Sequence, residues 1–424
     1  MASTHRHCTL DWDQRIFAVD SSPTLGITEP FYFTSQSNIP PDLPGTSPEW
    51  PMLVNGGAAH SVCVTIPHPV RAARLYRALG PRVSQAVPAG CKVLKLLSYL
   101  PGDPHRSLAS GFLICDPQSG TDTVDRLRAL LGEHRPHLYF CSYRQIPGGE
   151  VRKEPWGENG EPMECTRVVR VGAPDLSPFE INIQHCAVYN SLDRARTVLQ
   201  ECSTFIPEAT NVLDLLSKSN TSSGKGRFPV IVVEGLDATG KSTLTKTLQE
   251  SLKATLLISP PDCINQWRKR FDEEPTLIKR AYYAAGNYIV ASEIAKGSMQ
   301  SPVIVDRYWH STAAYAIATE TGGSVQNLPS RHHEIYQWPN DLLRPDLVIL
   351  LTVCDEERIK RMQRRGLEET KEEKELKSNS MFRQKVEEVY KRIENPQCII
   401  IDASFSKEMV FNEALSIIKK KCAI

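Results

Sequence analysis

The 424-residue sequence has no hydrophobic run approaching the ~18 residues that span a bilayer, and LVILLTV at 347–353 is typical of its longest runs. It also has almost no net charge, with 50 basic and 49 acidic residues. It therefore lacks the cationic field that binds nucleic acid or an anionic membrane nonspecifically. None of its 12 cysteines forms a C-x-x-C pair, which disfavours a structural zinc site and favours a reducing compartment. We expect no membrane span and no nucleic-acid partner.

The composition, 41% hydrophobic and 23% charged, is that of a folded globular protein, and the length predicts two domains. We place an α+β domain of unknown role at 1–218, a Ser/Gly-rich linker at 219–227 and an α/β domain at 228–424. In the first domain, hydrophobic periodicity predicts helices over 70–80 and 123–134. It predicts strands over 61–66, 91–100, 110–116 and 181–189.

From residue 228 onwards, short β-rich runs alternate with longer helical stretches, which predicts a five-stranded parallel sheet covered by helices on both faces. The predicted strands are 230–234, 255–258, 302–306, 347–353 and 398–402. The predicted helices are 241–253, 275–297, 309–320, 355–365, 379–394 and 406–421.

The segment VIVVEGLDATGKST places Gly235, four further residues, then Gly240, Lys241 and Ser242 between a predicted strand and a predicted helix. This is a P-loop in the context that the motif requires. Glycine lets successive backbone N–H groups point into one concavity, and the helix N-terminus adds positive potential. Lys241 would reach the β- and γ-phosphates, and the Ser242 hydroxyl would ligate Mg²⁺.

Other parts of the sequence narrow the class of P-loop protein. No guanine-reading N/T-K-x-D sequence and no D-x-x-G switch follows the motif, which disfavours a GTPase. The acids after strand 347–353 are better explained as helix-capping residues than as the acidic pair of an ATPase motor. Asp306 and Arg307 are more informative, because they stand where strand 302–306 ends, at the sheet edge beside the P-loop.

The motifs GLDATGKST, VDRYWHST, RPDLVILL, RIKRMQRRG and IIIDAS resemble, in order and spacing, the thymidylate kinase family of nucleoside monophosphate kinases. The resemblance is strongest over 228–424. Stretches such as SPVIVDRYWHSTAAYAIATE bring it closest to a mitochondrial branch of the family that acts on UMP and CMP.

The resemblance implies a role for each motif in phosphoryl transfer, a reaction that depends on positioning and charge neutralisation. Asp237 approaches the acceptor sugar, Asp306 organises Mg²⁺ through water, and Arg307 bridges the donor and acceptor phosphates. The residues that cradle the ATP phosphates are Gly235, Leu236, Asp237, Ala238, Thr239, Gly240, Lys241, Ser242 and Thr243.

In this family a further cation comes either from the P-loop or from a lid after helix 355–365. The variable P-loop positions, from Leu236 to Thr239, carry no cation. We therefore expect the lid to supply it through Arg364 or Arg365, which completes a catalytic set with Lys241, Asp306 and Arg307.

The acceptor site is expected on helix 275–297, where Tyr283 would stack on the pyrimidine while Tyr282 and Tyr288 are better explained as core residues. Thymidylate kinases usually have arginine where Asn287 falls, and an amide can both donate to and accept from a cytosine or uracil edge. The other expected acceptor-binding residues are Asp237, Arg268, Arg270, Arg307 and Tyr315.

The expected reaction is transfer from ATP, with Mg²⁺, to CMP or UMP and their deoxy forms. The alternatives are a thymidylate kinase and, in another class, a nucleotide-regulated interaction protein. A mitochondrial location follows from the resemblance only, because Asp11 and Asp13 interrupt any basic amphipathic transit segment. A cytoplasmic location is the alternative, and the oligomeric state is not predicted.

Overall fold

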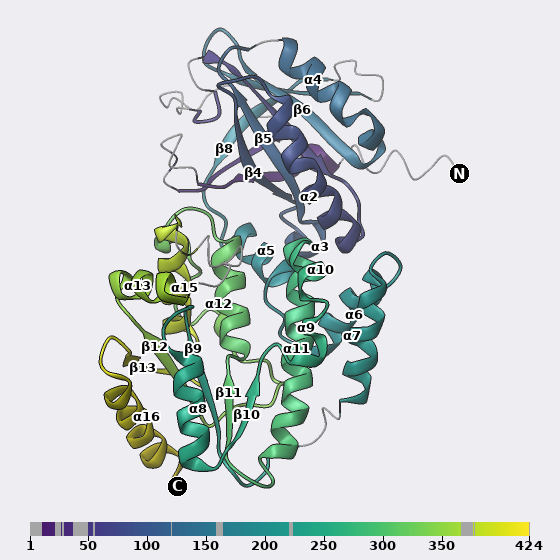
Figure 1. Ribbon diagram of the computed structural model, residues 1–424. Helices are drawn as coiled ribbons and strands as arrows, with labels where there is room; N and C mark the ends of the chain where they lie inside the picture. Colours follow the sequence, from purple (N-terminus) through teal and green to yellow (C-terminus); the bar gives the residue numbers. More distant parts are fainter. Residues whose placement is uncertain are drawn as a thin grey trace. The chain divides into compact units, whose positions relative to one another are not determined.

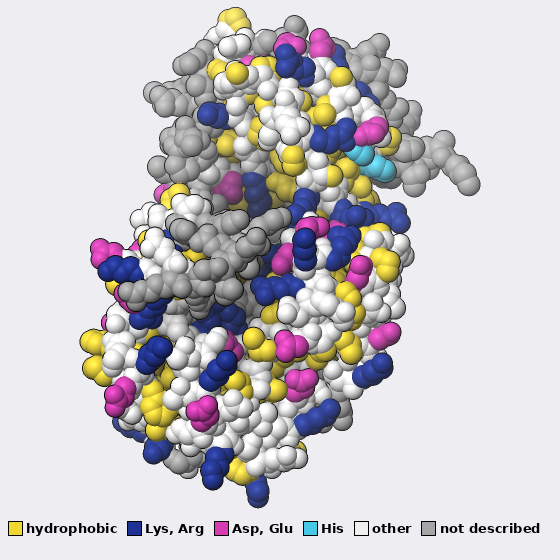
Figure 2. Space-filling model, viewed as in Figure 1, with side chains coloured by type: hydrophobic (Ala, Val, Ile, Leu, Met, Phe, Trp, Pro, Cys, Tyr) yellow, Lys and Arg dark blue, Asp and Glu magenta, His cyan; other side chains and the backbone are white. Residues whose placement is uncertain are grey.

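The computed structural model describes residues 11–21, 27, 29–36, 50–53, 56–119, 121–157, 164–219, 224–365, 376 and 378–423. The chain divides into two compact units, Met1–Asn182 and Ile183–Ile424 (Figure 1). None of the described helices combines the length and the apolar character needed to cross a bilayer. On the face drawn in Figure 2, Lys and Arg side chains are interspersed with Asp and Glu side chains, in keeping with the balanced composition.

The N-terminal unit is built on eight antiparallel strands that close into a barrel in the order β1-β2-β8-β7-β6-β3-β5-β4. Its strands are β1 (Ile16–Val19), β2 (Phe31–Gln36), β3 (Ala58–Val64), β4 (Lys92–Tyr99), β5 (Ala109–Asp116), β6 (Leu138–Gln145), β7 (Val151–Pro155) and β8 (Thr166–Val171). Its helices are η1 (Asp11–Asp13), α2 (Pro69–Ala86), α3 (Pro104–Ser107), α4 (Thr121–Leu131) and η4 (Gly132–His137), and α5 (Pro178–Cys186) crosses the division between the units.

Helices and antiparallel strands are mixed in this unit, as an α+β prediction requires, but the closure into a barrel was not predicted. The strand predicted over 181–189 was wrong, because α5 covers most of that segment. A short apolar run can form either a buried strand or a buried helix. Here Pro178 stands at the first helical position, where its fixed φ favours a helix start.

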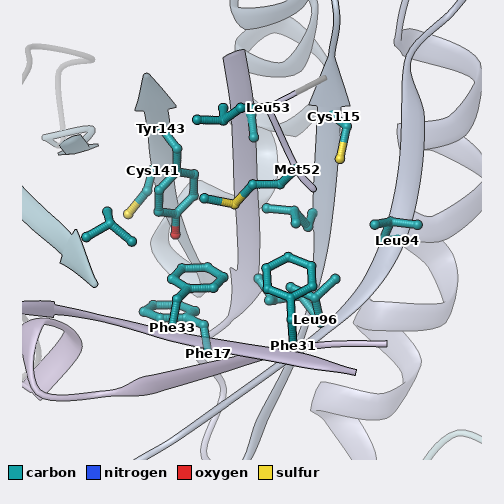
Figure 3. Packing of buried hydrophobic residues seen from close by; sticks show 14 of the residues in the cluster. Phe17, Phe31, Phe33, Met52, Leu53, Leu94, Leu96, Cys115, Cys141 and Tyr143 are labelled. Atoms are coloured by element: carbon teal, nitrogen blue, oxygen red, sulfur yellow. The ribbon is translucent and has the colours of Figure 1, made fainter. Parts of the chain in front are cut away.

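The main hydrophobic cluster of this unit combines aromatic, aliphatic and sulfur-containing side chains (Figure 3). The rings of Phe17 and Phe33 stack with centroids 5.1 Å apart, and Tyr143 meets Phe33 edge-on at 5.5 Å. Cys63 and Cys141 are fully buried beside them. The cysteines of this unit therefore include apolar core residues.

The C-terminal unit contains the predicted five-stranded parallel sheet, in the order β10-β11-β9-β12-β13 (Figure 1). Its strands are β9 (Val230–Gly235), β10 (Thr255–Ile258), β11 (Val303–Asp306), β12 (Leu347–Thr352) and β13 (Cys398–Asp402). Its helices are α6 (Leu192–Cys202), α7 (Pro207–Lys218), α8 (Lys241–Leu252), α9 (Asp262–Asn265), α10 (Arg268–Asp272), α11 (Thr276–Gly297), α12 (Trp309–Glu320), η5 (Val325–Asn327), η6 (Glu334–Tyr336), α13 (Asp355–Arg365), α15 (Ser380–Arg392) and α16 (Lys407–Cys422).

Helices α6 and α7 pack against α11 of this unit, although the predicted domain boundary had assigned them to the N-terminal domain. The predicted linker, 219–227, therefore lies later in the chain than the division between the compact units. Residues 220–223 of the predicted linker lie outside the described residues.

The register of the sheet brings the two most informative motifs together. Asp306, the last residue of β11, pairs with Val233 of the neighbouring strand β9. On the other side of β9, Gly235 pairs with Leu351 of β12. The P-loop and the Asp306–Arg307 pair therefore leave the same edge of the sheet, at the carboxyl ends of parallel strands where ligands bind in open α/β folds.

Candidate functional site

The P-loop requires glycine at its first position. Gly235 has φ 142°, and a Cβ built there would lie 2.5 Å from the backbone oxygen of Leu351 on the paired strand. Ala238 and Gly240 also have positive φ, at 66° and 100°. Gly240 is the N-cap of α8, so the loop turns directly into a helix N-terminus of the kind that binds phosphate.

Lys241 is buried, and its Nζ donates to the backbone oxygen of Leu236 at 2.7 Å. Burial lowers the pKa of Lys241 to about 8, and the nearby Arg307 guanidinium adds to this shift. A phosphate group beside Nζ would favour the charged form and reverse the shift. The buried site therefore disfavours the charged form of Lys241, and an anionic ligand would stabilise that form.

Asp306 and Ser242 meet across the P-loop and the end of β11. The Ser242 hydroxyl donates to Asp306 Oδ2 at 2.9 Å, and Asp306 is buried. A hydroxyl and a carboxylate provide the hard oxygen donors that Mg²⁺ prefers when phosphates complete its coordination. The pair thus fits the predicted magnesium role.

Arg307 and Asp237 form an ion pair with Nη2 2.6 Å from Oδ1, and the Arg307 Nη1 donates to the Ser311 hydroxyl at 3.0 Å. Burial alone would lower the pKa of Arg307, but Asp237 and further neighbours raise it well above its ordinary value. The Arg307 backbone has φ 66°, an uncommon conformation for a residue with a side chain. Its N–H donates to the Val233 oxygen at 3.0 Å, which helps to hold that conformation.

Glu234, which the sequence analysis did not select, lies behind this ion pair and is fully buried. Its carboxylate accepts from the Tyr308 N–H at 2.8 Å, from both the N–H and the hydroxyl of Ser311, and from Tyr390 Oη at 3.4 Å. Burial raises its pKa, while these hydrogen bonds oppose the shift. Glu234 therefore fixes Ser311, and Ser311 in turn accepts from Arg307.

Several of the residues described above line one cavity of about 310 Å³ in the C-terminal unit. Its lining includes Asp237, Lys241, Ser242, Asp306 and Arg307, together with three tyrosine side chains. Its complete lining is Asp237, Lys241, Ser242, Ile258, Ser259, Pro260, Asp262, Asn265, Arg268, Arg280, Tyr283, Asp306, Arg307, Tyr308, Ser311, Thr312 and Tyr315. The predicted acceptor residues Asp237, Arg268, Tyr283, Arg307 and Tyr315 are thus brought together.

A second cavity of about 490 Å³ is lined by other residues of the P-loop, including Ala238, Thr239, Gly240 and Thr243. Arg361 of α13 and Phe405 also line it. The Arg361 Nη1 donates to the Thr239 oxygen at 3.4 Å, and its Nη2 donates to the Ala403 oxygen at 2.8 Å. The P-loop therefore contributes to two cavities, as a loop that holds phosphates between two nucleosides would.

Several predicted site residues lie elsewhere. Asn287 is 1% exposed and does not line the first cavity, because Ser259 donates to its Oδ1 at 2.7 Å and its Nδ2 donates to Thr312 at 3.0 Å. Arg270 forms an ion pair with Glu274 and does not line the cavity. The side chains of Arg364 and Arg365, at the end of α13, lie outside the described residues.

Two tyrosines of α11 are core residues, as the helical spacing suggested. Tyr282 is fully buried and donates to the Ile264 oxygen at 2.9 Å, while Tyr288 is 2% exposed and donates to Asp341. Tyr283 differs, because it lines the cavity and its hydroxyl donates to Asp272 at 2.9 Å while accepting from Arg268 Nε at 3.0 Å.

Comparison with known proteins gives two concordant results. The family model described as thymidylate kinase matches residues 233–414. Human mitochondrial UMP-CMP kinase 2 is 46% identical over 400 residues, which span 92% of this chain and 89% of that protein. The chain belongs to the thymidylate kinase family. It is a nucleoside monophosphate kinase, and so a phosphotransferase.

Other kinases match less than half of this chain. A probable thymidylate kinase of Methanococcus maripaludis is 30% identical over 209 residues, 45% of this chain and 95% of that protein. Among solved structures, thymidylate kinase from Candida albicans is 23% identical with a TM-score of 0.36, covering 46% of this chain and 92% of that one. Deoxyadenosine kinase from M. mycoides is 18% identical with a TM-score of 0.32, and the match covers 45% of this chain and 99% of that one.

The site residues that the sequence analysis did not select include Glu234, Arg280 and Arg361. A signal existed for the first two. Glu234 is an acid that ends an otherwise apolar strand directly before the P-loop. Arg280 stands three residues before Tyr283 on the same helix, a spacing that places two side chains on one helix face.

Proposed function

We propose that this kinase transfers the γ-phosphoryl group of ATP to CMP and UMP, and to their deoxy forms, giving ADP and the pyrimidine nucleoside diphosphate. The proposal is supported by the name of its human relative, UMP-CMP kinase 2. The structural observation that carries it is a single cavity lined by Lys241, Asp306, Arg307 and Tyr283. Groups for two phosphates and for one aromatic base therefore converge on one space.

The residues of the chain would divide the reaction as follows. The P-loop amides and Lys241 hold the β- and γ-phosphates, with the adenosine in the cavity beside Arg361. Arg307, which contacts Asp237 of the P-loop, would lie between the donor and acceptor phosphates, where its guanidinium can donate to both and neutralise the charge that spreads in the transition state. Asp237 and Ser311 orient that guanidinium.

Magnesium would be held by the Ser242 hydroxyl directly and by Asp306 through water, together with phosphate oxygens. When bound, it would neutralise phosphate charge and favour in-line geometry. The residues of the chain would position the acceptor. The Tyr283 ring lines the cavity and would stack on the pyrimidine. The centroid of the Tyr315 ring lies 5.9 Å from Arg307 Cζ.

Acceptance of both cytosine and uracil is supported at Asn287, where an amide replaces the arginine expected of thymidylate kinases. Asn287 would act indirectly, because it holds the hydroxyls of Ser259 and Thr312, and both of these line the cavity. The Ser259 hydroxyl donates to Asn287 and can accept from a base, whereas the Thr312 hydroxyl accepts from Asn287 and can donate to a base, so together they can meet either base.

A coupled assay of ADP release with Mg·ATP and CMP, dCMP, UMP, dUMP or dTMP tests the proposal. We expect turnover with cytidylates and uridylates, and a kcat/KM for dTMP that is at least about tenfold lower. A preference for dTMP would favour a thymidylate kinase. Tight ATP binding without acceptor-dependent ADP release would favour a nucleotide-regulated interaction protein.

A mitochondrial location is part of the proposal and is supported by the name of the same relative. Fractionation of cells that express the full chain tests it. Recovery with the mitochondrial matrix is expected, and recovery only in the cytosol would contradict it.

A further inference from the structure

Arg280 is a buried cation that the phosphoryl-transfer scheme does not use. It is 5% exposed, yet it lines the cavity that also contains Tyr283 and Asp306. Within the described residues, its Nη2 donates a long hydrogen bond to Thr319 Oγ1 at 3.4 Å, its buried Nε has no hydrogen-bond partner, and the guanidinium forms no ion pair. A guanidinium withdrawn from water needs acceptors. A bound molecule would supply them.

The position of Arg280 places it away from the phosphates. Arg307 is bonded to Ser311 in the first turn of α12, whereas Arg280 is bonded to Thr319 near the end of that helix. Eight residues of α-helix correspond to about 12 Å. The two arginines are therefore bonded to positions about two helical turns apart along α12.

Arg280 also lies beside the aromatic ring expected to stack on the acceptor. Its Cζ is 5.9 Å from the centroid of the Tyr283 ring, and both side chains come from one face of α11. A pyrimidine stacked on Tyr283 would present an edge to this guanidinium. The acceptor group that Arg280 needs is then on the base, not on a phosphate.

We propose that Arg280 donates a hydrogen bond to the C2 carbonyl oxygen of the acceptor's pyrimidine base, an inference that rests on the proposed CMP and UMP kinase activity. A guanidinium can only donate. Cytosine and uracil have opposite hydrogen-bonding character at N3 and at the 4-position, but both carry a carbonyl acceptor at C2. A donor-only group serves both bases at that oxygen alone.

This assignment divides base recognition into a fixed part and an adaptable part. Arg280 donates to the C2 carbonyl oxygen, which cytosine and uracil share. The hydroxyls of Ser259 and Thr312, positioned by Asn287, are left to meet the edge on which the bases differ. Dual specificity then requires no movement of the backbone.

Replacing the C2 oxygen by sulfur, a much weaker acceptor, tests the contact in the full-length enzyme. In the wild type we expect kcat/KM for 2-thio-UMP to be about tenfold below that for UMP, mainly through KM. In Arg280→Met, kcat/KM for UMP should fall about tenfold, and the ratio between the two substrates should approach one. The ratio of kcat/KM for UMP to kcat/KM for 4-thio-UMP should be the same in the wild type and in Arg280→Met.

Lys296→Met is the matched control, because it removes an exposed cation from the same helix and should change neither substrate ratio. A wild type that uses 2-thio-UMP as well as UMP would overturn the proposal without any variant. So would an Arg280→Met enzyme that loses both substrates equally, because that pattern indicates a structural role. If Arg280→Met does not fold, Arg280→Lys and Thr319→Val provide the same substrate comparison.

These results are distinguishable from failure of the proposed function. A wild type that phosphorylates no pyrimidine monophosphate would refute the activity, and the base contact with it. A wild type that phosphorylates CMP and UMP but is indifferent to sulfur at C2 would refute only the role of Arg280.

Discussion

The guanidinium of Arg307 lies 2.6 Å from the carboxylate of Asp237, so the residue after strand β11 is joined to the variable part of the P-loop. Both side chains are largely buried, and Ser311 receives a second hydrogen bond from the same guanidinium. A planar guanidinium with several fixed donors can be oriented in this way, whereas an ammonium group cannot. The pair therefore sets the orientation of the cation that we place between the two phosphates.

Arg307→Lys should lower kcat about 10²-fold while changing the midpoint of thermal unfolding little, because a lysine keeps the charge but loses the second donor. Steady-state kinetics with CMP as acceptor, together with a thermal scan, measures both quantities. Turnover equal to that of the wild type would remove Arg307 from the reaction.

ATP affinity should fall as pH rises above about 8, because the pKa of Lys241 is lowered to about 8 in the nucleotide-free site. Phosphate binding favours the charged lysine, so above that pKa each complex must take up a proton, and Kd can rise by up to about tenfold per pH unit. Calorimetric titration at constant Mg²⁺ from pH 7 to 10 measures the effect. Lys241→Met should bind weakly with no such dependence.

The same shift has an opposite consequence for stability. Between pH 8 and the ordinary lysine value of 10.5, the unfolded chain holds a proton on Lys241 that the folded chain has lost. The contribution of Lys241 to the free energy of unfolding therefore rises with pH across this window. Urea titrations at several pH values measure the free energy of unfolding. Between pH 8 and 10.5 this free energy should rise less, or decline more steeply, in Lys241→Met than in the wild type. The same pH dependence in both proteins would contradict the lowered pKa of Lys241.

Glu234→Gln should lower the free energy of unfolding by about 2–4 kcal/mol. The buried carboxylate accepts hydrogen bonds from Tyr308, Ser311 and Tyr390, whereas the NH₂ group of a glutamine would face some of these donors with a donor of its own. We also expect kcat to fall about tenfold as Ser311 releases Arg307. Urea titration and kinetics measure the two effects. Glu250→Gln, at an exposed acid on α8, is the control and should leave both unchanged.

Gly235→Ala should destabilise the C-terminal unit by about 1–3 kcal/mol and weaken ATP binding, because φ is 142° and the new Cβ would lie 2.5 Å from the Leu351 oxygen. Gly102→Ala, which adds a Cβ with no heavy atom within 4 Å, should cost little. Equal effects of the two substitutions on urea unfolding would argue against the close approach of the loop to β12.

The arginines of α13 should separate into two kinetic classes. Arg361 lines the second cavity, so Arg361→Ala should raise KM for ATP about tenfold with a smaller effect on kcat. Arg365→Ala, or Arg364→Ala, should instead lower kcat far more than it lowers nucleotide affinity. Unchanged kcat in both of the latter variants would remove the lid arginines from the mechanism.

The sheet and the phosphate site were predictable because each rests on a local pattern. The strand β9, the P-loop and α8 follow one another in a motif whose geometry requires glycine, and Asp306 ends an apolar strand that parallel pairing places next to β9. The closure of the N-terminal barrel was not predictable, because it depends on pairing between β1 and β4, which lie far apart in the sequence.

The acceptor pocket was only partly predictable. Helical spacing separated Tyr283 from Tyr282 and Tyr288, but it could not show that Ser259 and Thr312 enclose Asn287. Those contacts come from three separate segments of the chain. Helical spacing places Arg280 on the face of Tyr283, but its burial could not be predicted, because it depends on the packing of α12 against α11.

The most direct test of the account is a crystal structure with a bisubstrate ligand in which adenosine and cytidine are joined through their 5′ positions by five phosphates. We predict that the polyphosphate lies between the P-loop amides and Arg307, with adenine beside Arg361 and Phe405 and cytosine on the Tyr283 ring. Electron density for the ligand at any other place, or with its phosphates away from residues 235–243, would contradict it.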